Sequence, residues 1–317
     1  MQDGPEVARV VFDVTEALPA EVTLGERVEI VGRLFLPPEP PKGRASVLTL
    51  LHGGSYDWRY FHVEVPGHPG YSMARNLAAR GHVALALDQL GVGESSRPAQ
   101  PRKAVREVVA KATHAAMTQA YERLRGGTLD PRLPPLTDLL KVGVGHSMGG
   151  MQVITEQANY QTYDLVAVLG HSNVGAYIEV NGKPVKNTAP FDEASPDYKT
   201  LDRDRVMRSF HWEETPDAVM AEDAAIAVQY PAILGWQAQQ GSTDLDAGRI
   251  TTPVFLVMGE RDVSPDDLAE VGFYRGSPDV TFMRLERSAH CHNFAPTRRK
   301  LWSRLHGWIE SLAALDA

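Results

Sequence analysis

The sequence predicts an α/β fold, with a mostly parallel sheet of eight strands packed between helices. Three observations support this prediction. Short apolar runs recur along the 317 residues, helical patterns separate them, and one long stretch without a clear strand interrupts the alternation. Alternating strands and helices join parallel strands through helical crossovers, which is the arrangement of an α/β fold.

The central strands are predicted from runs that are apolar on both faces, as expected for strands buried between two layers of helices. Two earlier segments, Val7–Phe12 and Val28–Leu36, are interrupted by charged residues, and we expect them to form an antiparallel pair at one edge. The apolar runs are Ser46–Leu51, Val83–Leu87, Val142–Val144, Leu165–Leu169, Val254–Met258 and Val280–Leu285.

The helices of the main domain are predicted from their boundary residues. Ser72–Arg80 precedes Gly81, a residue type suited to the position just after a helix. Ala104–Arg125 is a longer helical pattern. Ala295–Leu315 closes the chain, with Pro296 near its first turn, where proline is tolerated.

The interruption lies between Leu169 and Val254. Its length of about 85 residues far exceeds the roughly 2–6 residues of a usual connection in such folds. An inserted unit is therefore expected. We predict a helical cap at residues 175–245 and a core domain made of residues 1–174 and 246–317.

Short helices are predicted inside this cap. Ser195 and Thr215 each precede a proline, which pairs an N-cap residue with proline at the first helical position. Pro231 and Gly241 bracket a third helix. Seven aromatic residues in a lid would enclose an apolar pocket, and we expect Trp212 to line it. The seven are Tyr177, Phe191, Tyr198, Phe210, Trp212, Tyr230 and Trp236.

Composition excludes several classes of protein. Apolar residues make up 43% of the chain, and the net charge of −8 argues against a nucleic-acid surface. Cys291 is the only cysteine, Met1–Glu6 lacks a signal-peptide pattern, and no apolar run reaches the roughly 18 residues of a membrane span. His290, Cys291 and His292 lack further ligands at matching spacing. We expect a cytoplasmic protein without a metal or other cofactor.

The strongest motif is the pentapeptide Gly145–Gly149, which reads GHSMG. It follows the strand Lys141–Val144 and precedes a helical pattern. A G-x-S-x-G sequence between strand and helix places its serine on a sharp turn, with the helix N-terminus beneath it. We therefore predict that Ser147 is a nucleophile.

Two later strands end in groups that could activate this serine. The strand Val254–Met258 leads to Asp262, and the strand Val280–Leu285 leads to His290. A serine hydroxyl needs a base to remove its proton, and the base needs a carboxylate to fix its tautomer. Because parallel strands gather such groups at their carboxyl ends, Asp262 is the predicted acid and His290 the predicted base.

Each partner has a rival in the sequence. Glu260 could replace Asp262, although it lies nearer the strand, and His292 could replace His290. Asp88 also ends a strand, but we expect it to organise the loop that follows.

A glycine-rich turn follows the strand at Ser46–Leu51. Acyl transfer creates an oxyanion, which needs fixed N–H donors. We assign one donor to Gly54 and the other to Met148, the residue after the nucleophile. His52 is expected to brace the loop.

Together these pieces resemble the α/β-hydrolase superfamily over nearly the whole chain, including its order of serine, acid and histidine and the position of the cap. Arg287 and Ser288 stand where relatives often carry glycine or proline. The matching pieces are His52-Gly53-Gly54, Asp88–Ser95, Gly145–Gly149, Gly259–Asp262 and Ala289-His290.

The resemblance implies a serine hydrolase, but it leaves the substrate open. Serine at position 147 argues against haloalkane dehalogenase and epoxide hydrolase chemistry, which uses aspartate there. The leading expectation is hydrolysis of a medium-sized apolar or aromatic ester or lactone through an acyl-enzyme. A C–C bond hydrolase acting on a diketone-like substrate is the alternative enzyme, and a ligand-binding receptor is the alternative outside enzymes. The oligomeric state stays open.

Overall fold

The computed structural model describes residues 7–180, 183–186 and 190–315. The first six residues, on which the expectation about a signal peptide was based, lie outside the described part. So do short pieces of the expected cap.

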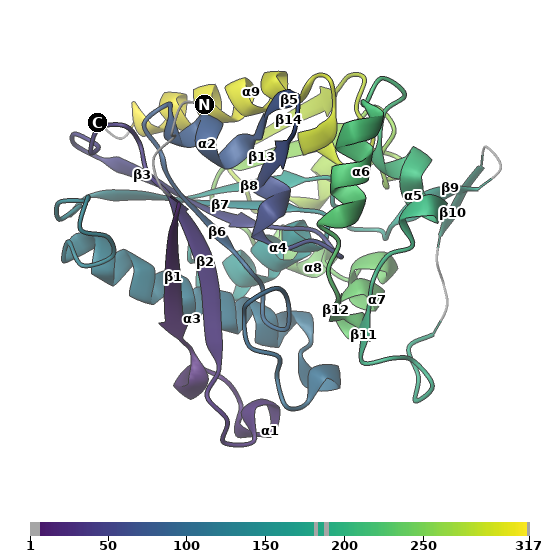
Figure 1. The fold of residues 1–317 in the computed structure, drawn as a ribbon, viewed down its shortest axis with the longest axis horizontal. Coiled ribbons are helices and arrows are strands. Elements are labelled where there is room, and N and C mark those ends of the chain that lie inside the picture. The colour runs from purple at the N-terminus through teal and green to yellow at the C-terminus, as the bar shows by residue number, and fades with distance from the viewer. Residues whose placement is uncertain (1–6, 181–182, 187–189, 316–317) are drawn as a thin grey trace.

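The centre of the molecule is an eight-stranded sheet with the order β1-β2-β6-β3-β7-β8-β13-β14 (Figure 1). β2 runs antiparallel to both of its neighbours, and every pair from β6 to β14 is parallel. The predicted sheet and its antiparallel edge pair are thus confirmed. The strands are β1 (Ala8–Asp13), β2 (Glu29–Phe35), β3 (Ala45–Leu51), β6 (Val83–Leu87), β7 (Leu139–His146), β8 (Leu165–Leu169), β13 (Val254–Gly259) and β14 (Val280–Leu285).

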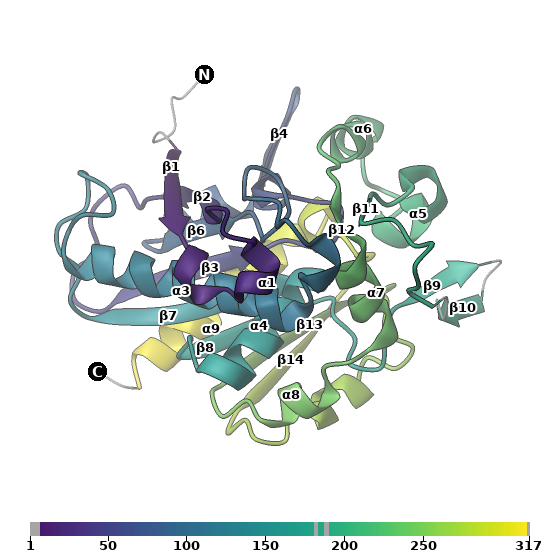
Figure 2. The same cartoon turned by 90° about the horizontal axis from the view of Figure 1, so that it is seen from below.

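Helices cover both faces of this sheet (Figures 1 and 2). α2 (Met73–Ala78) and α9 (Arg298–Ala313) lie on one face, and α3 (Arg106–Arg125) and α4 (Met148–Tyr160) lie on the other. α9 begins later than predicted because the residue before Pro296 is extended, the conformation that a following proline favours.

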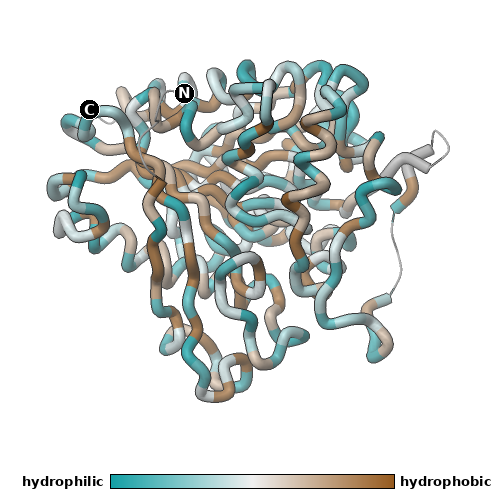
Figure 3. Tube along the Cα trace, in the orientation of Figure 1, coloured by the Kyte–Doolittle hydropathy of each residue, from teal (hydrophilic) through white to brown (hydrophobic). Residues whose placement is uncertain are grey.

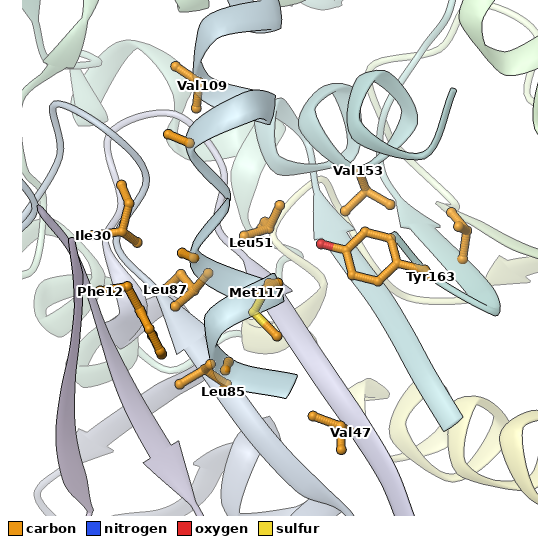
Figure 4. Packing of buried hydrophobic residues seen from close by; sticks show 14 of the residues in the cluster. Phe12, Ile30, Val47, Leu51, Leu85, Leu87, Val109, Met117, Val153 and Tyr163 are labelled. Atoms are coloured by element: carbon orange, nitrogen blue, oxygen red, sulfur yellow. The ribbon is translucent and has the colours of Figure 1, made fainter. Parts of the chain in front are cut away.

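Alternate residues of the buried strands face opposite layers. On β3, Val47 and Leu51 belong to the cluster under α3 and α4, whereas Leu48 and Leu50 belong to the cluster under α2 and α9. Figure 4 shows the first cluster, where Met117 of α3 packs above the strands. Figure 3 colours the backbone by hydropathy, and its apolar segments run through the interior of the molecule. They correspond to the apolar strand runs of the sequence.

Smaller elements join these parts. They are α1 (Ala20–Thr23), the hairpin β4 (His62–Val65) and β5 (His68–Ser72), and the 3-10 helices Thr15–Ala17, Trp58–Phe61, Pro101–Lys103, Ala269–Phe273 and His292–Phe294.

No helix in the described residues is long and apolar enough to cross a membrane.

The segment between β8 and β13 forms short strands as well as helices. β9 pairs with β10, and β11 pairs with β12. These strands were not predicted, because segments of two to four residues leave no periodic pattern in a sequence. The elements are β9 (Tyr177–Val180), β10 (Lys183–Lys186), β11 (Tyr198–Lys199), α5 (Arg203–Phe210), α6 (Asp217–Ala225), β12 (Tyr230–Pro231), α7 (Ala232–Gln240) and α8 (Asp244–Gly248).

Two of the three predicted helix starts in this segment are observed, after Thr215 and after Pro231. The third is not. Ser195 lies in a turn whose backbone N–H groups bond to the carboxylate of Asp192, and the chain then continues into β11. Local side-chain bonding of this kind competes with helix formation.

Candidate active site

Ser147 lies between the end of β7 and the start of α4. Its φ of 55° falls in the left-handed region, which is unfavourable for a non-glycine residue and is characteristic of a strained functional turn. The turn requires glycine on both sides. A Cβ at Gly145 would lie 2.2 Å from the carbonyl oxygen of Gly149, and one at Gly149 would lie 2.0 Å from that of Leu51.

The structure brings the three residues predicted for catalysis into one hydrogen-bonded chain. His290 Nε2 lies 2.9 Å from Ser147 Oγ, and His290 Nδ1 lies 2.7 Å from Asp262 Oδ1. His290 reaches this position although Arg287, before it, adopts a φ of 49°, the conformation for which glycine is better suited. Both side chains that flank the imidazole are therefore within hydrogen-bond reach.

Asp262 is held as an anion. Burial would raise the pKa of its carboxyl group, but the neighbouring charge of His290 and the hydrogen bonds from His290 and His292 outweigh that effect and lower the pKa. The backbone N–H groups of Gly259 and Val263 also donate to it, at 2.7 and 2.8 Å. A carboxylate with four donors favours its charged form.

The rival residues occupy other positions. His292 Nε2 lies 2.8 Å from Asp262 Oδ2, so it shares the acid with His290 rather than contacting the serine. Glu260 accepts a hydrogen bond from the backbone N–H of Arg287. Asp88 accepts the backbone N–H of Glu94, in the loop that it was expected to organise, and burial raises its pKa to about 6.

His146, the second residue of the pentapeptide, is a site residue that was not predicted from the sequence. Its Nε2 lies 2.8 Å from the carbonyl oxygen of His290, and its ring stacks on Tyr60 at a centroid distance of 4.4 Å. Burial lowers its pKa well below the usual value, so the ring is neutral and can donate to that carbonyl. His146 thus fixes the backbone of His290. The histidine is visible in the motif, but its role could not be predicted because its hydrogen-bond partner lies 144 residues away in the sequence.

The two predicted oxyanion donors border the same cavity as Ser147. Met148 is the first residue of α4, where backbone N–H groups have no partner within the helix. A Cβ at Gly54 would lie 3.4 Å from the ring of Tyr230. His52 braces this turn, because its Nδ1 lies 2.9 Å from the carbonyl oxygen of Gly53. The side chain of Gln89 donates a hydrogen bond to the carbonyl oxygen of His52 at 2.6 Å.

The cavity above Ser147 has a volume of about 690 Å³, within the range of small-molecule pockets. The aromatic residues that line it are Tyr56, Phe210 and Tyr230. Trp212 is placed elsewhere. The guanidinium of Arg261 lies 4.8 Å from its ring centroid, outside the lining of the cavity.

Backbone hydrogen bonds attach the inserted segment to the loop that carries His290. The backbone N–H groups of His290 and Cys291 donate to carbonyl oxygens at the end of α5, both at 3.0 Å. Beneath that helix, buried Asp223 accepts a hydrogen bond from His211 at 3.0 Å and lies 3.8 Å from the guanidinium of Arg203. The position of His290 therefore depends on both parts of the chain.

One group outside the cavity has the residue types of a metal site. His82, just before β6, and His306 and Glu310 of α9 place their candidate ligand atoms within 4.8 Å of one another. His82 Nε2 and His306 Nδ1 are 2.9 Å apart and hydrogen-bond to each other.

Residues 50–299 match the model of the alpha/beta hydrolase family. Because this match covers more than half of the chain, the protein belongs to that family and is a hydrolase. No curated protein sequence matches the chain.

Solved structures agree with this fold. A peroxisomal alpha-beta-hydrolase from Saccharomyces cerevisiae has a TM-score of 0.64 at 12% identity, over 99% of this chain and 90% of that one. An esterase from Exiguobacterium antarcticum gives 0.61 at 16%, over 91% and 98%. A proline iminopeptidase from Mycobacterium smegmatis gives 0.61 at 16%, over 92% and 98%. Similarities this distant establish the fold and leave the reaction open.

Proposed function

We propose that the protein hydrolyses a medium-sized carboxylic ester or lactone through an acyl-enzyme on Ser147. The observation that supports this most directly is the hydrogen-bonded chain from Ser147 Oγ through His290 to Asp262, at 2.9 and 2.7 Å, beside a cavity of about 690 Å³. An esterase and an N-acyl homoserine lactonase are among the structural neighbours, at 16% identity each.

In the first half of the reaction, His290 Nε2 accepts the proton of Ser147 as Oγ attacks the carbonyl carbon. The backbone N–H groups of Gly54 and Met148 hold the oxyanion. The tetrahedral intermediate then collapses, and the alcohol leaves with the proton that His290 returns. Asp262 fixes the imidazole tautomer and stabilises its cationic form during this transfer.

In the second half, water attacks the acyl carbon while His290 accepts one of its protons. Collapse of this second intermediate releases the carboxylic acid, and the proton returns to Ser147 Oγ. Turnover should therefore fall at acid pH, because a protonated imidazole cannot accept the serine proton.

We assign residues 175–245 to a cap over this site, with residues 1–174 and 246–317 as the core domain. Lys199, Phe210 and Tyr230 support the assignment, because they lie in the inserted segment and line the cavity that Ser147 borders. A cap limits the water around the oxyanion and strengthens the interactions that stabilise it. The enclosed volume favours a medium-sized acyl compound over a long-chain triglyceride.

The test is a panel of esters, lactones and diketones with the wild type and Ser147→Ala. The variant should lose about 10³–10⁶-fold in turnover while its fold survives. A fluorophosphonate should label Ser147 in the wild type and in the control Ser303→Ala, which removes an exposed hydroxyl on α9. If Ser147→Ala kept a tenth of the activity, the nucleophile would be another group. Cleavage of diketones alone would replace ester hydrolysis by C–C bond hydrolysis.

A further inference from the structure

Lys199 brings a positive charge into the cavity that Ser147 borders. It lies on β11, directly opposite Tyr230 of β12. Directly paired residues on neighbouring strands have adjacent side chains. The ammonium nitrogen is 5.8 Å from the centroid of the Tyr230 ring, so the two side chains lie together in the wall of the cavity.

The other charges that line the cavity are engaged or exposed. Lys186 donates to two backbone carbonyl oxygens, of Val174 at 2.7 Å and of Gln240 at 3.0 Å. Arg205 and Asp202 are exposed at the start of α5, with opposite charges.

Lys199 is different. It is half-buried, and among the described residues the structure gives its ammonium no hydrogen bond or ion pair. Burial lowers its pKa from the usual value. A partly buried cation without an anion is unfavourable, and a bound anion would remove that cost.

The side chains of Lys199 and Tyr230 both pack closely against Gly235, where only glycine leaves room for them. A Cβ at Gly235 would lie 2.9 Å from Lys199 Cε and 2.8 Å from the hydroxyl oxygen of Tyr230. The same tyrosine ring also approaches Gly54, with 3.4 Å between Cζ and a Cβ placed there. Lys199 and the turn that carries the proposed oxyanion donor therefore both lie next to the ring of Tyr230.

We propose that Lys199 binds a free carboxylate of the substrate, so that the preferred substrates are half-esters of short dicarboxylic acids. This inference rests on the proposed function. An ammonium is a compact charge that pairs well with a carboxylate, and the phenol of Tyr230 supplies a neighbouring donor. Burial raises the pKa of that phenol, which keeps its proton in place.

The test compares monoethyl esters of succinic, glutaric and adipic acid with the neutral esters in which an amide replaces the carboxylate. For the best chain length, the wild type should prefer the charged ester by about 10- to 100-fold in kcat/KM. Lys199→Met should bring the ratio of charged to neutral ester, measured within the same variant, close to one, and Lys199→Arg should restore most of the preference.

Lys186→Met is the matched control, because it removes the same charge from the same cavity. It should change the ratio of charged to neutral ester by less than about 3-fold, since the ammonium of Lys186 is already bonded to carbonyl oxygens. A wild-type ratio near one, or an equal loss of the ratio in Lys186→Met and Lys199→Met, would overturn the inference.

A binding measurement separates this inference from the proposed reaction. Calorimetry should detect monoethyl glutarate binding to Ser147→Ala and a loss of at least about 10-fold in affinity in Ser147→Ala/Lys199→Met. If no ester is hydrolysed but this difference is found, the proposed reaction fails and the carboxylate site stands. If neutral esters are hydrolysed and the two affinities are equal, the reaction stands and the carboxylate site fails.

Discussion

The central sheet and the inserted segment hold their polar side chains in different ways. Ser147 and Asp262 follow strands that are buried on both sides, His290 follows the edge strand β14, and each of the three is fixed by hydrogen bonds to neighbouring segments. Lys199 lies on a two-residue strand, beside a tyrosine, without a fixed partner in the described residues. Bond cleavage requires that the reacting groups be held in precise positions, which a rigid sheet provides. A cavity wall built from short elements can instead differ in its side chains, and so in the substrates that it accepts.

If this division is correct, changes in the sheet should affect every ester alike. The largest effect is expected for Asp262→Asn, which removes the charge that fixes the tautomer of His290. Turnover should fall about 10⁴-fold on charged and neutral esters alike, with the fold intact. Glu260→Gln is the matched control and should be near normal. The opposite ranking in steady-state kinetics would move the acid to Glu260.

The second prediction concerns α5, an element of the inserted segment that also holds the backbone of His290. Asp223→Ala would leave Arg203 buried without its carboxylate neighbour, at a cost of about 3 kcal/mol. Because α5 accepts hydrogen bonds from the backbone of His290, kcat should fall for all esters together with stability. Urea unfolding and kinetics measure the two effects. Unchanged stability, with altered preference alone, would place this ion pair among the groups that select substrate.

A smaller effect is expected at His292, which shares Asp262 with His290. His292→Ala should lower kcat by about 10- to 100-fold, since the acid loses one of its donors, while His290→Ala should be nearly inactive. The ratio of charged to neutral esters should not move. If His292→Ala were the more damaging change, the base would be His292.

The smallest effect on turnover is expected for Glu156→Gln, which changes stability alone. Glu156 lies in α4, and burial raises its pKa to about 8. Between the usual pKa of a glutamic acid side chain and pH 8, the folded protein retains a proton that the unfolded chain has lost. The free energy of unfolding therefore decreases as the pH rises.

The slope should approach about 1.4 kcal/mol per pH unit in that window. Urea unfolding from pH 5 to 8 should show a flatter profile for Glu156→Gln than for the wild type or for the exposed control Glu122→Gln. Identical slopes in all three proteins would mean that Glu156 ionises without cost.

Local patterns in the sequence predicted the sheet and the positions of Ser147, Asp262 and His290. An apolar run and a glycine-flanked serine can be read from a few consecutive residues. The surroundings of the site could not be read in that way. The pairing of Lys199 with Tyr230 joins two-residue strands that are distant in sequence, and its existence depends on the fold of the whole insertion.

Trp212 illustrates the same limit. An aromatic residue in the inserted segment was a reasonable candidate for the cavity wall, yet its ring lies against Arg261 instead. Which face of a short segment turns inward is decided by its long-range contacts, and these leave no signature in residue type.

The glycines of the two regions set different limits on laboratory evolution of this protein. Replacements at Gly145 or Gly149 would collide with backbone oxygen atoms, which have no room to move, so a randomised library should return glycine there for any substrate. At Gly235 the nearest atoms belong to the side chains of Tyr230 and Lys199, and these can be exchanged together with it. A library that varies these three positions jointly would search new substrate preferences while leaving the nucleophile in place.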